Sequence, residues 1–252
     1  MKNLCLGLMM AALACTGVRG EEEGPKMPPL KVCMLSGSAE YKSDESLGEF
    51  KPWLEAHYNV ACTLLSGKDG SSTIPGIEAL DSSDLMLVFM RRISLAPDQL
   101  ARVKKHCRAG KPVIGLRTAS HGFQNWLEFD KEVLGGNYKG HYGAGPITEV
   151  KVAEKAKDHP ILTGLKPFTS TCSLYKNTGA AEAVELLMTG TIPGHTEPLA
   201  WTRVQNGGRV FCTSLGGPDD FKNENFRRLI VNAIFWTAKR AVEATSAAAA
   251  IP

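Results

Sequence analysis

The segment GKPVIGLRTASHGF, residues 110–123, decides the class of fold that the sequence predicts. Its run at residues 111–116 is predicted to be a strand of a parallel sheet with helices on both faces. The strand leads into a turn that contains Arg117, Ser120 and His121. Ligands of open parallel sheets bind at the carboxyl ends of the strands, so these three side chains are candidates for a functional site.

The first half of the chain repeats this pattern of apolar strands alternating with helices. Strands are predicted at 30–37, 59–67, 84–90 and 111–116, helices at 43–58 and 96–110, and a helical turn at 75–80. This alternation predicts a parallel sheet with helices on both faces. Short strands follow at 147–153, 183–192, 198–204 and 209–216, and a last helix at 220–240. The sequence QNGG before the last strand predicts a β-hairpin, because Asn and Gly tolerate positive φ angles.

The N-terminus indicates an exported protein. Residues 1–20 have a basic start, an apolar stretch and then small residues, which is typical of a signal peptide too short to span a bilayer. Cleavage is expected after Ala14 or Gly20; alternatively, Cys15 becomes the acylated first residue of a lipoprotein. We therefore expect a periplasmic or extracellular protein without a transmembrane segment. A single domain is expected at 28–240 and a disordered tail at 241–252.

Composition and charge exclude several classes of protein. The chain is 43% hydrophobic and 22% charged, which allows an ordinary buried core. Without residues 1–20, 27 basic residues stand against 26 acidic ones, so charge gives no argument for a nucleic-acid partner. The remaining cysteines are widely spaced and are expected to be small buried hydrophobes rather than disulfide or metal ligands. They are Cys33, Cys62, Cys107, Cys172 and Cys212.

The turn after residue 116 lacks the nucleophiles of two enzyme classes. A Cys-His amidotransferase needs a thiol where Arg117 stands, so glutaminase activity is not expected. A serine hydrolase needs G-x-S-x-G, but Thr118 replaces the first glycine before Ser120. The guanidinium of Arg117 can hold a carboxylate or polarise a sugar oxygen, and an ion pair with a neighbouring acid explains it equally well.

Other polar side chains occur in turn-rich segments. His121, His141 and His195 are flanked by glycines and can approach a ligand closely. A metal site would require them to converge with Glu197, Asp219 or Asp220, and no HxH or HxxxH spacing supports this, so no metal or other cofactor is expected. The segment 36–46 can hold an anion on helix amides, and its Glu40 and Tyr41 can contact a polyol or simply be solvated.

Several segments, taken together and in order, resemble the ThuA-like family, named for trehalose utilisation, over about residues 30–239. They are KVCMLSG, GKPVIGLRTASHGF, VLGGNYKGHYG, HPILTGL, SLYKN, PLAWT and GGRVFCTSLGGPDDFKNENFRRLIVNAIFW. The resemblance implies an amidotransferase-like fold without the glutaminase nucleophile. We therefore expect an α/β fold that is flavodoxin-like or class I glutamine amidotransferase-like, with a mostly parallel sheet, helices on both faces and a β-hairpin in the second half.

The sequence departs from the family pattern at three places. Many members carry GLH after the central strand, DELY before the hairpin and LGH after the last strand. This chain has Arg117, CSLY at 172–175 and Gly217 there, which removes two histidines and a carboxylate pair and weakens a metal interpretation. The positions that match the family pattern are His121, His141, Tyr175, Asp219 and Asp220.

The resemblance implies carbohydrate metabolism, in particular breakdown of glycosides that a partner dehydrogenase has oxidised to keto-sugars. Our hypothesis is an exported enzyme that removes the acidic proton beside the ketone, after which elimination or isomerisation follows. Arg117, His121 and His141 are the predicted catalytic residues, and the predicted sugar-binding residues are Glu40, Tyr41, Tyr175, Asp219 and Asp220. The alternatives are a non-catalytic glycan-binding or scaffold module with a degenerate amidotransferase-like site, and a metal-dependent hydrolase. The expected partner is a small sugar or glycoside, and no particular oligomeric state is predicted.

Overall fold

The computed structural model describes residues 27–68, 71–178 and 184–245; the predicted signal peptide and Cys15 lie outside them. The strands are β1 Leu30–Gly37, β2 Val60–Ser66, β3 Leu85–Met90, β4 Val113–Leu116, β5 Thr148–Val152, β6 Phe168–Ser170, β7 Glu185–Ile192, β8 His195–Gln205 and β9 Gly208–Thr213. The longer helices are α1 Ser43–His57, α2 Pro97–Arg108 and α3 Glu224–Thr237. Short helical segments are Ala39–Tyr41, Ile77–Ser82, Arg117–His121, Asp130–Leu134, Glu154–Ala156, Pro160–Leu162 and Asp220–Lys222.

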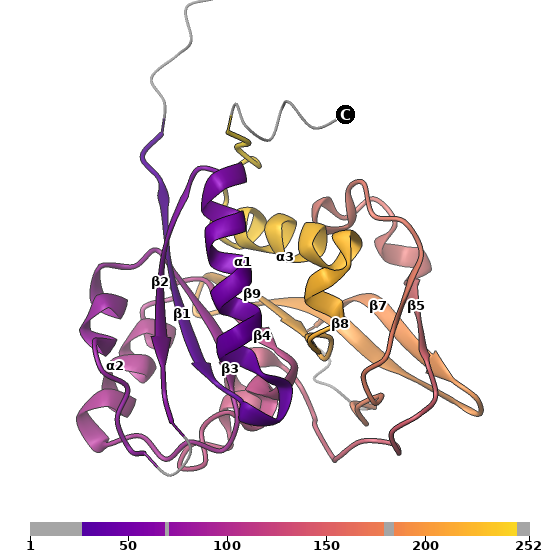
Figure 1. Ribbon diagram of the computed structural model, residues 1–252, viewed down its shortest axis with the longest axis horizontal. Helices are drawn as coiled ribbons and strands as arrows, with labels where there is room; N and C mark the ends of the chain where they lie inside the picture. The colour runs from indigo at the N-terminus through magenta and orange to yellow at the C-terminus, as the bar shows by residue number, and fades with distance from the viewer. Residues whose placement is uncertain (1–26, 69–70, 179–183, 246–252) are drawn as a thin grey trace, which may run out of the picture.

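The strands form one sheet in the order β2-β1-β3-β4-β9-β8-β7-β5-β6 (Figure 1). From β2 to β9 the neighbours are parallel, whereas from β9 to β6 they are antiparallel. The expectation of a mostly parallel sheet is therefore corrected to a mixed sheet. Helical crossovers enforce parallel pairing only in the first half, while the later strands connect through hairpins and other turns that allow them to run back.

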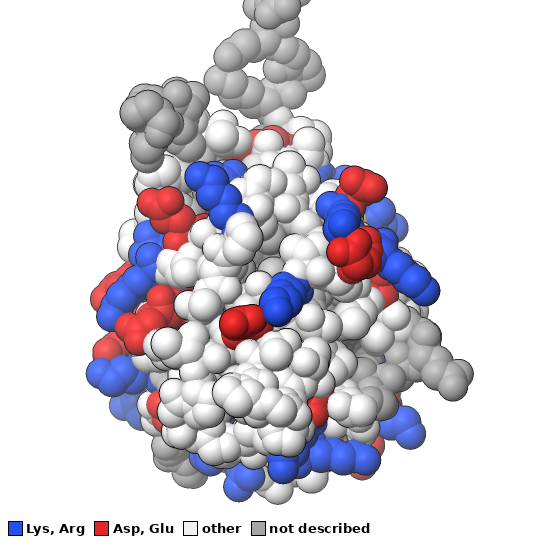
Figure 2. Space-filling view, turned by 90° about the vertical axis from the view of Figure 1, so that its right-hand side faces the viewer, with Lys and Arg blue, Asp and Glu red and all other residues white. Residues whose placement is uncertain are grey.

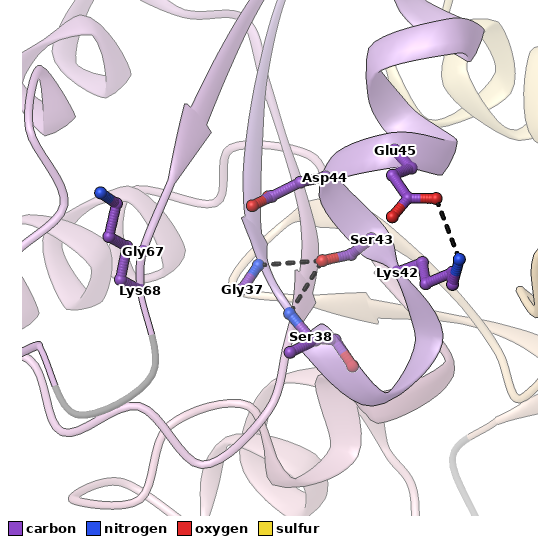
Figure 3. A pocket seen from close by; sticks show the side chains of 9 residues that line it. Gly37, Ser38, Lys42, Ser43, Asp44, Glu45, Gly67 and Lys68 are labelled. Carbon is purple, nitrogen blue, oxygen red and sulfur yellow. Dashed lines mark hydrogen bonds and ion pairs between the residues drawn. The ribbon is translucent and has the colours of Figure 1, made fainter.

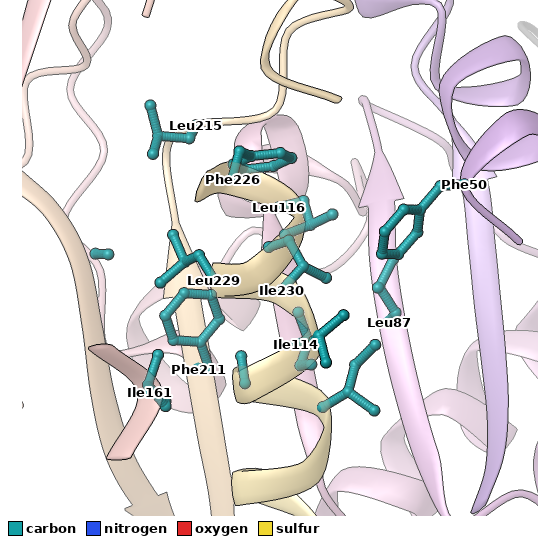
Figure 4. Packing of buried hydrophobic residues seen from close by; sticks show 14 of the residues in the cluster. Phe50, Leu87, Ile114, Leu116, Ile161, Phe211, Leu215, Phe226, Leu229 and Ile230 are labelled. Carbon is teal, nitrogen blue, oxygen red and sulfur yellow. The ribbon is translucent and has the colours of Figure 1, made fainter. Parts of the chain in front are cut away.

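Helices cover both faces of the sheet, as predicted. Helices α1 and α3 pack on one face, where Phe50 and Phe226 join the strand residues Leu87 and Ile114 in one apolar cluster (Figure 4). Helix α2 packs on the other face through Val103 and its neighbours. Because successive strand residues point to opposite faces, a central strand needs apolar side chains at nearly every position. Strands β3 and β4, which are apolar and buried at every position, meet this requirement.

The predicted hairpin is confirmed between β8 and β9. Asn206 and Gly207 form its turn with φ angles of 50° and 80°. Gly208 follows, and a Cβ there would come within 2.2 Å of the carbonyl oxygen of Gly110. The hairpin can therefore approach the end of α2 closely only because Gly208 and Gly110 both lack a Cβ atom. The three-residue edge strand β6 was not predicted.

Part of the C-terminal segment that we expected to be disordered packs on the domain. The amide of Asn59 donates to the carbonyl of Glu243 over 2.9 Å, and the amide of Thr245 donates to the carbonyl of His57 over 2.8 Å. Arg240 also pairs with the Glu243 carboxylate over 2.8 Å. Residues 241–245 are thus held at the end of α1, because the backbone groups of His57 and Asn59 form hydrogen bonds with them.

The charges on the surface are of both signs, and most of the described cysteines are buried. On the face shown in Figure 2, basic and acidic side chains are interspersed, one of each lies near the centre, and a broad area below them is uncharged. No helix in the described ranges is both long and apolar enough to cross a membrane. The five cysteines described are free thiols; four are buried, and Cys172 is intermediate.

Candidate functional site

Arg117 lies directly after β4, at the carboxyl edge of the parallel strands. Its backbone adopts a left-handed conformation with φ of 47°, which is uncommon for a residue other than glycine. The side chain turns into the protein and is only 2% exposed. Nη1 donates to the carbonyl of Ser214 over 2.6 Å, and Nη2 donates to the hydroxyls of Ser173 and Tyr41 over 2.9 and 3.0 Å. The guanidinium thus ties together the ends of distant segments.

Two tyrosine rings enclose the Arg117 guanidinium. Its central carbon lies 3.9 Å from the ring centroid of Tyr175 and 4.6 Å from that of Tyr41. Among the residues that the structure describes, no carboxylate forms an ion pair with Arg117, so the expected alternative of a neighbouring acid is not observed. Cation–π contacts and neutral hydrogen-bond acceptors hold the charge instead. Its Nε is buried without a hydrogen-bond partner.

His121 ends the short helical segment that Arg117 begins, and it is 9% exposed. Its ring stacks on Tyr138 at a centroid distance of 4.5 Å, and its Nδ1 is 3.0 Å from the Ser120 hydroxyl. Burial, together with the nearby charge of Arg92, lowers the pKa of His121 to about 4. The imidazole is therefore neutral at physiological pH and can polarise an oxygen without carrying a charge of its own.

His141 and His121 both lie near the ring of Tyr175. An isolated antiparallel bridge joins the backbones of His141 and Tyr175, and the centroid of the Tyr175 ring is 6.4 Å from His141 and 6.2 Å from His121. The exposed His141 ring places Nδ1 at 2.7 Å from the carbonyl oxygen of Tyr142. Since a carbonyl only accepts, Nδ1 carries the proton, and Nε2 of the neutral ring has a free lone pair. This arrangement suits a base.

The predicted sugar-binding residues divide into two groups. Tyr41 and Tyr175 contact Arg117, and Glu40 pairs with Arg91 over 2.6 Å beside them. Asp219 and Asp220 instead lie in the turn after β9. The exposed Asp219 pairs with Lys222 over 3.1 Å, while Oδ2 of the buried Asp220 accepts hydrogen bonds from the amides of Gly216 and Gly217. The Asp220 carboxylate therefore serves the backbone of its own turn.

A separate cavity of about 390 Å³ lies beside the start of α1, where an anion was one expectation (Figure 3). The Ser43 hydroxyl accepts hydrogen bonds from the amides of Gly37 and Ser38 over 3.2 and 2.8 Å. Asp44 and Glu45 also line the cavity. Lys42 and Lys68 line it too, so its charges balance. The two amides that could hold an anion are already satisfied by Ser43, and the cavity therefore gives no support for an anion site.

The remaining candidate metal ligands do not converge. Glu197 is buried and accepts hydrogen bonds from the Tyr142 hydroxyl and the amide of Asn177, both over 2.9 Å, and His195 stacks on the Tyr142 ring. In the part of the chain that the structure describes, no three His, Cys, Asp or Glu residues are grouped to hold a metal ion. These residues provide no ligand set for the metal-dependent hydrolase.

Several residues of the site were not predicted. Tyr138 stacks on His121, Ser173 and the carbonyl of Ser214 accept from Arg117, and Arg91 and Arg92 follow β3 at the same edge. The position of Arg91 and Arg92 after an apolar strand is a signal that could have been used. A backbone carbonyl such as that of Ser214 has no signal in the sequence.

Comparison with known proteins identifies relatives of the whole domain. The model of the ThuA family, described as trehalose utilisation, matches residues 31–237. No curated protein matches the chain.

Solved structures show the same fold at low sequence identity. A ThuA-like protein from Parabacteroides merdae has a TM-score of 0.68 and 17% identity, with 83% of this chain and 90% of that chain covered. A ThuA-like protein from Bacteroides uniformis has a TM-score of 0.66 and 17% identity, with 86% and 95% covered. A β-galactosidase from Rahnella sp. R3 has a TM-score of 0.55 and 14% identity, with 85% of this chain and 32% of that chain covered.

Proposed function

Because the chain belongs to the ThuA family, whose description is trehalose utilisation, we propose that it is an exported enzyme that acts on a keto-glycoside. The proposed reaction begins by removal of the proton on the carbon beside the ketone. One observation supports this assignment above the others: a buried cation, two histidines and a tyrosine hydroxyl gather at the carboxyl edge of the parallel strands. Enolisation needs a base and a cation-supported hydrogen bond to the developing oxyanion.

In the proposed mechanism His141 is the base. Its Nε2 takes the proton, and the electrons of the broken C–H bond form the enediolate, with negative charge on the former ketone oxygen. Elimination then breaks the glycosidic C–O bond, and the departing alkoxide takes the proton from the His141 imidazolium. Isomerisation instead delivers this proton to the former ketone carbon, while the proton of the adjacent hydroxyl moves to the former ketone oxygen, so that the adjacent carbon becomes the new ketone.

Arg117 acts on the oxyanion through Tyr41. The Tyr41 oxygen accepts a hydrogen bond from Nη2 over 3.0 Å, so its own O–H remains free to donate to the substrate oxygen. The adjacent positive charge strengthens this donation as negative charge develops. His121, which is neutral, can donate a second hydrogen bond to the same oxygen.

Proton NMR in deuterated water tests the reaction. The mature protein is mixed with a 3-keto-glucoside, and the protons on carbons beside the ketone are followed. We expect enzyme-dependent loss of these signals, and a loss of rate of at least about 100-fold in His141→Gln, as is typical for removal of a general base. The matched control is His57→Gln, since His57 lies at the far end of α1 and its ring contacts the Trp53 carbonyl.

The alternative of a glycan-binding module makes a different prediction. It is favoured by the burial of Arg117, whose Nη atoms already donate to protein acceptors. In that case the sugar binds saturably and its proton signals persist. Saturable binding without proton exchange would therefore contradict the proposed enzyme and support the glycan-binding module.

A further inference from the structure

The carboxyl edge of β3 and β4 carries more positive charge than nearby acids balance. Arg91 is paired with Glu40. Arg92 is exposed and Arg117 is buried, and within residues 27–68, 71–178 and 184–245 neither has a carboxylate within ion-pair distance. Two uncompensated cations at one edge create a local potential that favours a negatively charged ligand.

The backbone places Arg92 at this edge under strain. Its φ is 50°, and the φ of Arg117 at the end of the neighbouring strand is 47°. The amide of Arg92 donates to the carbonyl of His121 over 2.8 Å, which joins the two turns. A left-handed conformation is strained for arginine and free for glycine, so Arg92 is a candidate for a functional role.

The charge of Arg92 also reaches the groups of the proposed catalytic site. It contributes, after burial, to the lowered pKa of His121. It acts in the same direction on the phenol of Tyr138, where burial is the larger influence and raises the pKa. Because the Arg92 amide bonds to the His121 carbonyl and the His121 ring stacks on Tyr138, Arg92 lies next to these groups and can bind part of a substrate that contacts them.

We propose that the sugar bound at this site carries an oxyanionic group, a carboxylate or a phosphate, and that Arg92 binds this group. The inference rests on the proposed function and specifies its substrate class. The arginine side chain presents paired N–H donors that match the oxygens of either anion. Arg117, already engaged by Ser214, Ser173 and Tyr41, adds its charge without needing to touch the anion.

Calorimetric titration of the mature protein near pH 7.5 and low salt tests the proposal. The probes are glucose, glucuronate, glucose 6-phosphate and inorganic phosphate. We expect at least one anionic sugar to bind about tenfold more tightly than glucose, as is typical of a charge-assisted hydrogen bond. Preference for glucuronate identifies a carboxylate, and preference for glucose 6-phosphate identifies a phosphate. The preference should weaken at high salt.

Variants assign the preference to Arg92. Arg92→Gln should bring the anionic sugar to within about twofold of glucose, and Arg92→Lys should retain part of the difference, because lysine keeps the charge without the paired donors. Arg108→Gln is the matched control, since Arg108 is exposed at the far end of α2. Arg92→Gly removes the charge and relieves the backbone strain, so it separates a loss of binding from a loss of folding.

Three results would overturn the inference: equal binding of neutral and anionic sugars, an unchanged preference in Arg92→Gln, or inorganic phosphate binding as tightly as glucose 6-phosphate with no binding of glucuronate. The NMR exchange assay is independent of these. Exchange of a neutral 3-keto-glucoside without anion preference leaves the proposed function and removes the inference. Anion preference without exchange of neutral or anionic keto-sugars would leave an anion-binding site at Arg92 and remove the proposed enzymatic function.

Discussion

At the scale of single residues, Arg117 bonds mainly to neighbouring protein groups, so its first effect is on the structure of the site. It is almost fully buried, and its donors engage Ser214, Ser173 and Tyr41. Breaking such a set of contacts affects the position of several segments at once. The more direct test of catalysis is therefore the hydroxyl that Arg117 polarises, because removing it leaves the guanidinium with its other partners.

We predict that Tyr41→Phe lowers the turnover of the keto-glycoside reaction by about 100-fold with little change in KM, as is typical for loss of one oxyanion donor. The ring of Phe would still cover the guanidinium, so the fold should be retained. Tyr58→Phe is the matched control at the opposite edge of the sheet. A rise in KM with an unchanged kcat would show that Tyr41 only binds the substrate.

The sequence predicted which polar residues lie together at this edge better than it predicted their contacts. Arg117, His121, Tyr41 and Tyr175 do meet, because they follow strands or lie in loops that reach one edge of the sheet. The sequence could not reveal that Arg117 turns inward. That orientation depends on the left-handed backbone of Arg117 and on the carbonyl of Ser214 in the turn after β9. Neither feature can be recognised from the type of side chain in the sequence.

At the scale of elements, the turn between β9 and α3 depends on one carboxylate. Oδ2 of Asp220 accepts from the amides of Gly216 and Gly217 over 2.8 and 3.0 Å, and the Cys172 thiol lies 3.4 Å away. Gly216 has a φ of 129°, a conformation that requires glycine. The turn begins at Ser214, so its shape sets the position of the carbonyl that holds Arg117.

We predict that Asp220→Ala lowers the free energy of unfolding by about 2–4 kcal/mol, because two buried amides lose their acceptor. Asp220→Asn keeps an acceptor oxygen and should cost less. Asp219→Ala is the matched control: its carboxylate is exposed, and its loss should change stability by less than about 1 kcal/mol. Urea unfolding measures all three, and similar losses for both alanine variants would refute the structural role of Asp220.

The same contrast shows a limit of sequence reasoning for elements. Asp219 and Asp220 are equivalent in the sequence, and only the fold decides which one faces the amides. Strands with continuous apolar runs, such as β3, were predicted because burial on both faces demands that pattern. The edge strand β6 has only three residues and one buried side chain, so it carries no comparable pattern.

At the scale of the whole molecule, strand order was not accessible from the pattern of elements. Strand β9 comes last in the chain yet pairs with β4 in parallel, and β8 follows it in the opposite direction. The hairpin turn at Asn206 predicted that β8 and β9 are antiparallel to each other, but not where the pair joins the sheet. Long-range contacts decide that position, and this is why a mostly parallel sheet was expected.

Stability of the whole molecule should respond to the protonation of Asp130. This residue is buried behind the loop that carries Tyr138, and its Oδ2 accepts from the Tyr138 amide over 2.9 Å, while Oδ1 has no hydrogen-bond partner. Burial raises the pKa of Asp130 from 3.8 to about 6. The folded state thus binds this proton more tightly than the unfolded chain, so its contribution to stability is fully present below pH 3.8 and is lost as pH rises through about 6.

We predict that Asp130→Asn removes this pH dependence. Ionisation of Asp130 lowers the free energy of unfolding of the wild type by roughly 3 kcal/mol above pH 7. At pH 5 the decrease is only about half as large. The variant should therefore gain roughly 1–2 kcal/mol relative to the wild type when urea unfolding is compared at pH 8 and pH 5. Other titrating groups, including the histidines, cancel in this difference. The exposed Asp158→Asn should show no such gain, and an Asp130→Asn difference that is equal at both pH values would mean that the Asp130 carboxylate is not desolvated in the folded protein.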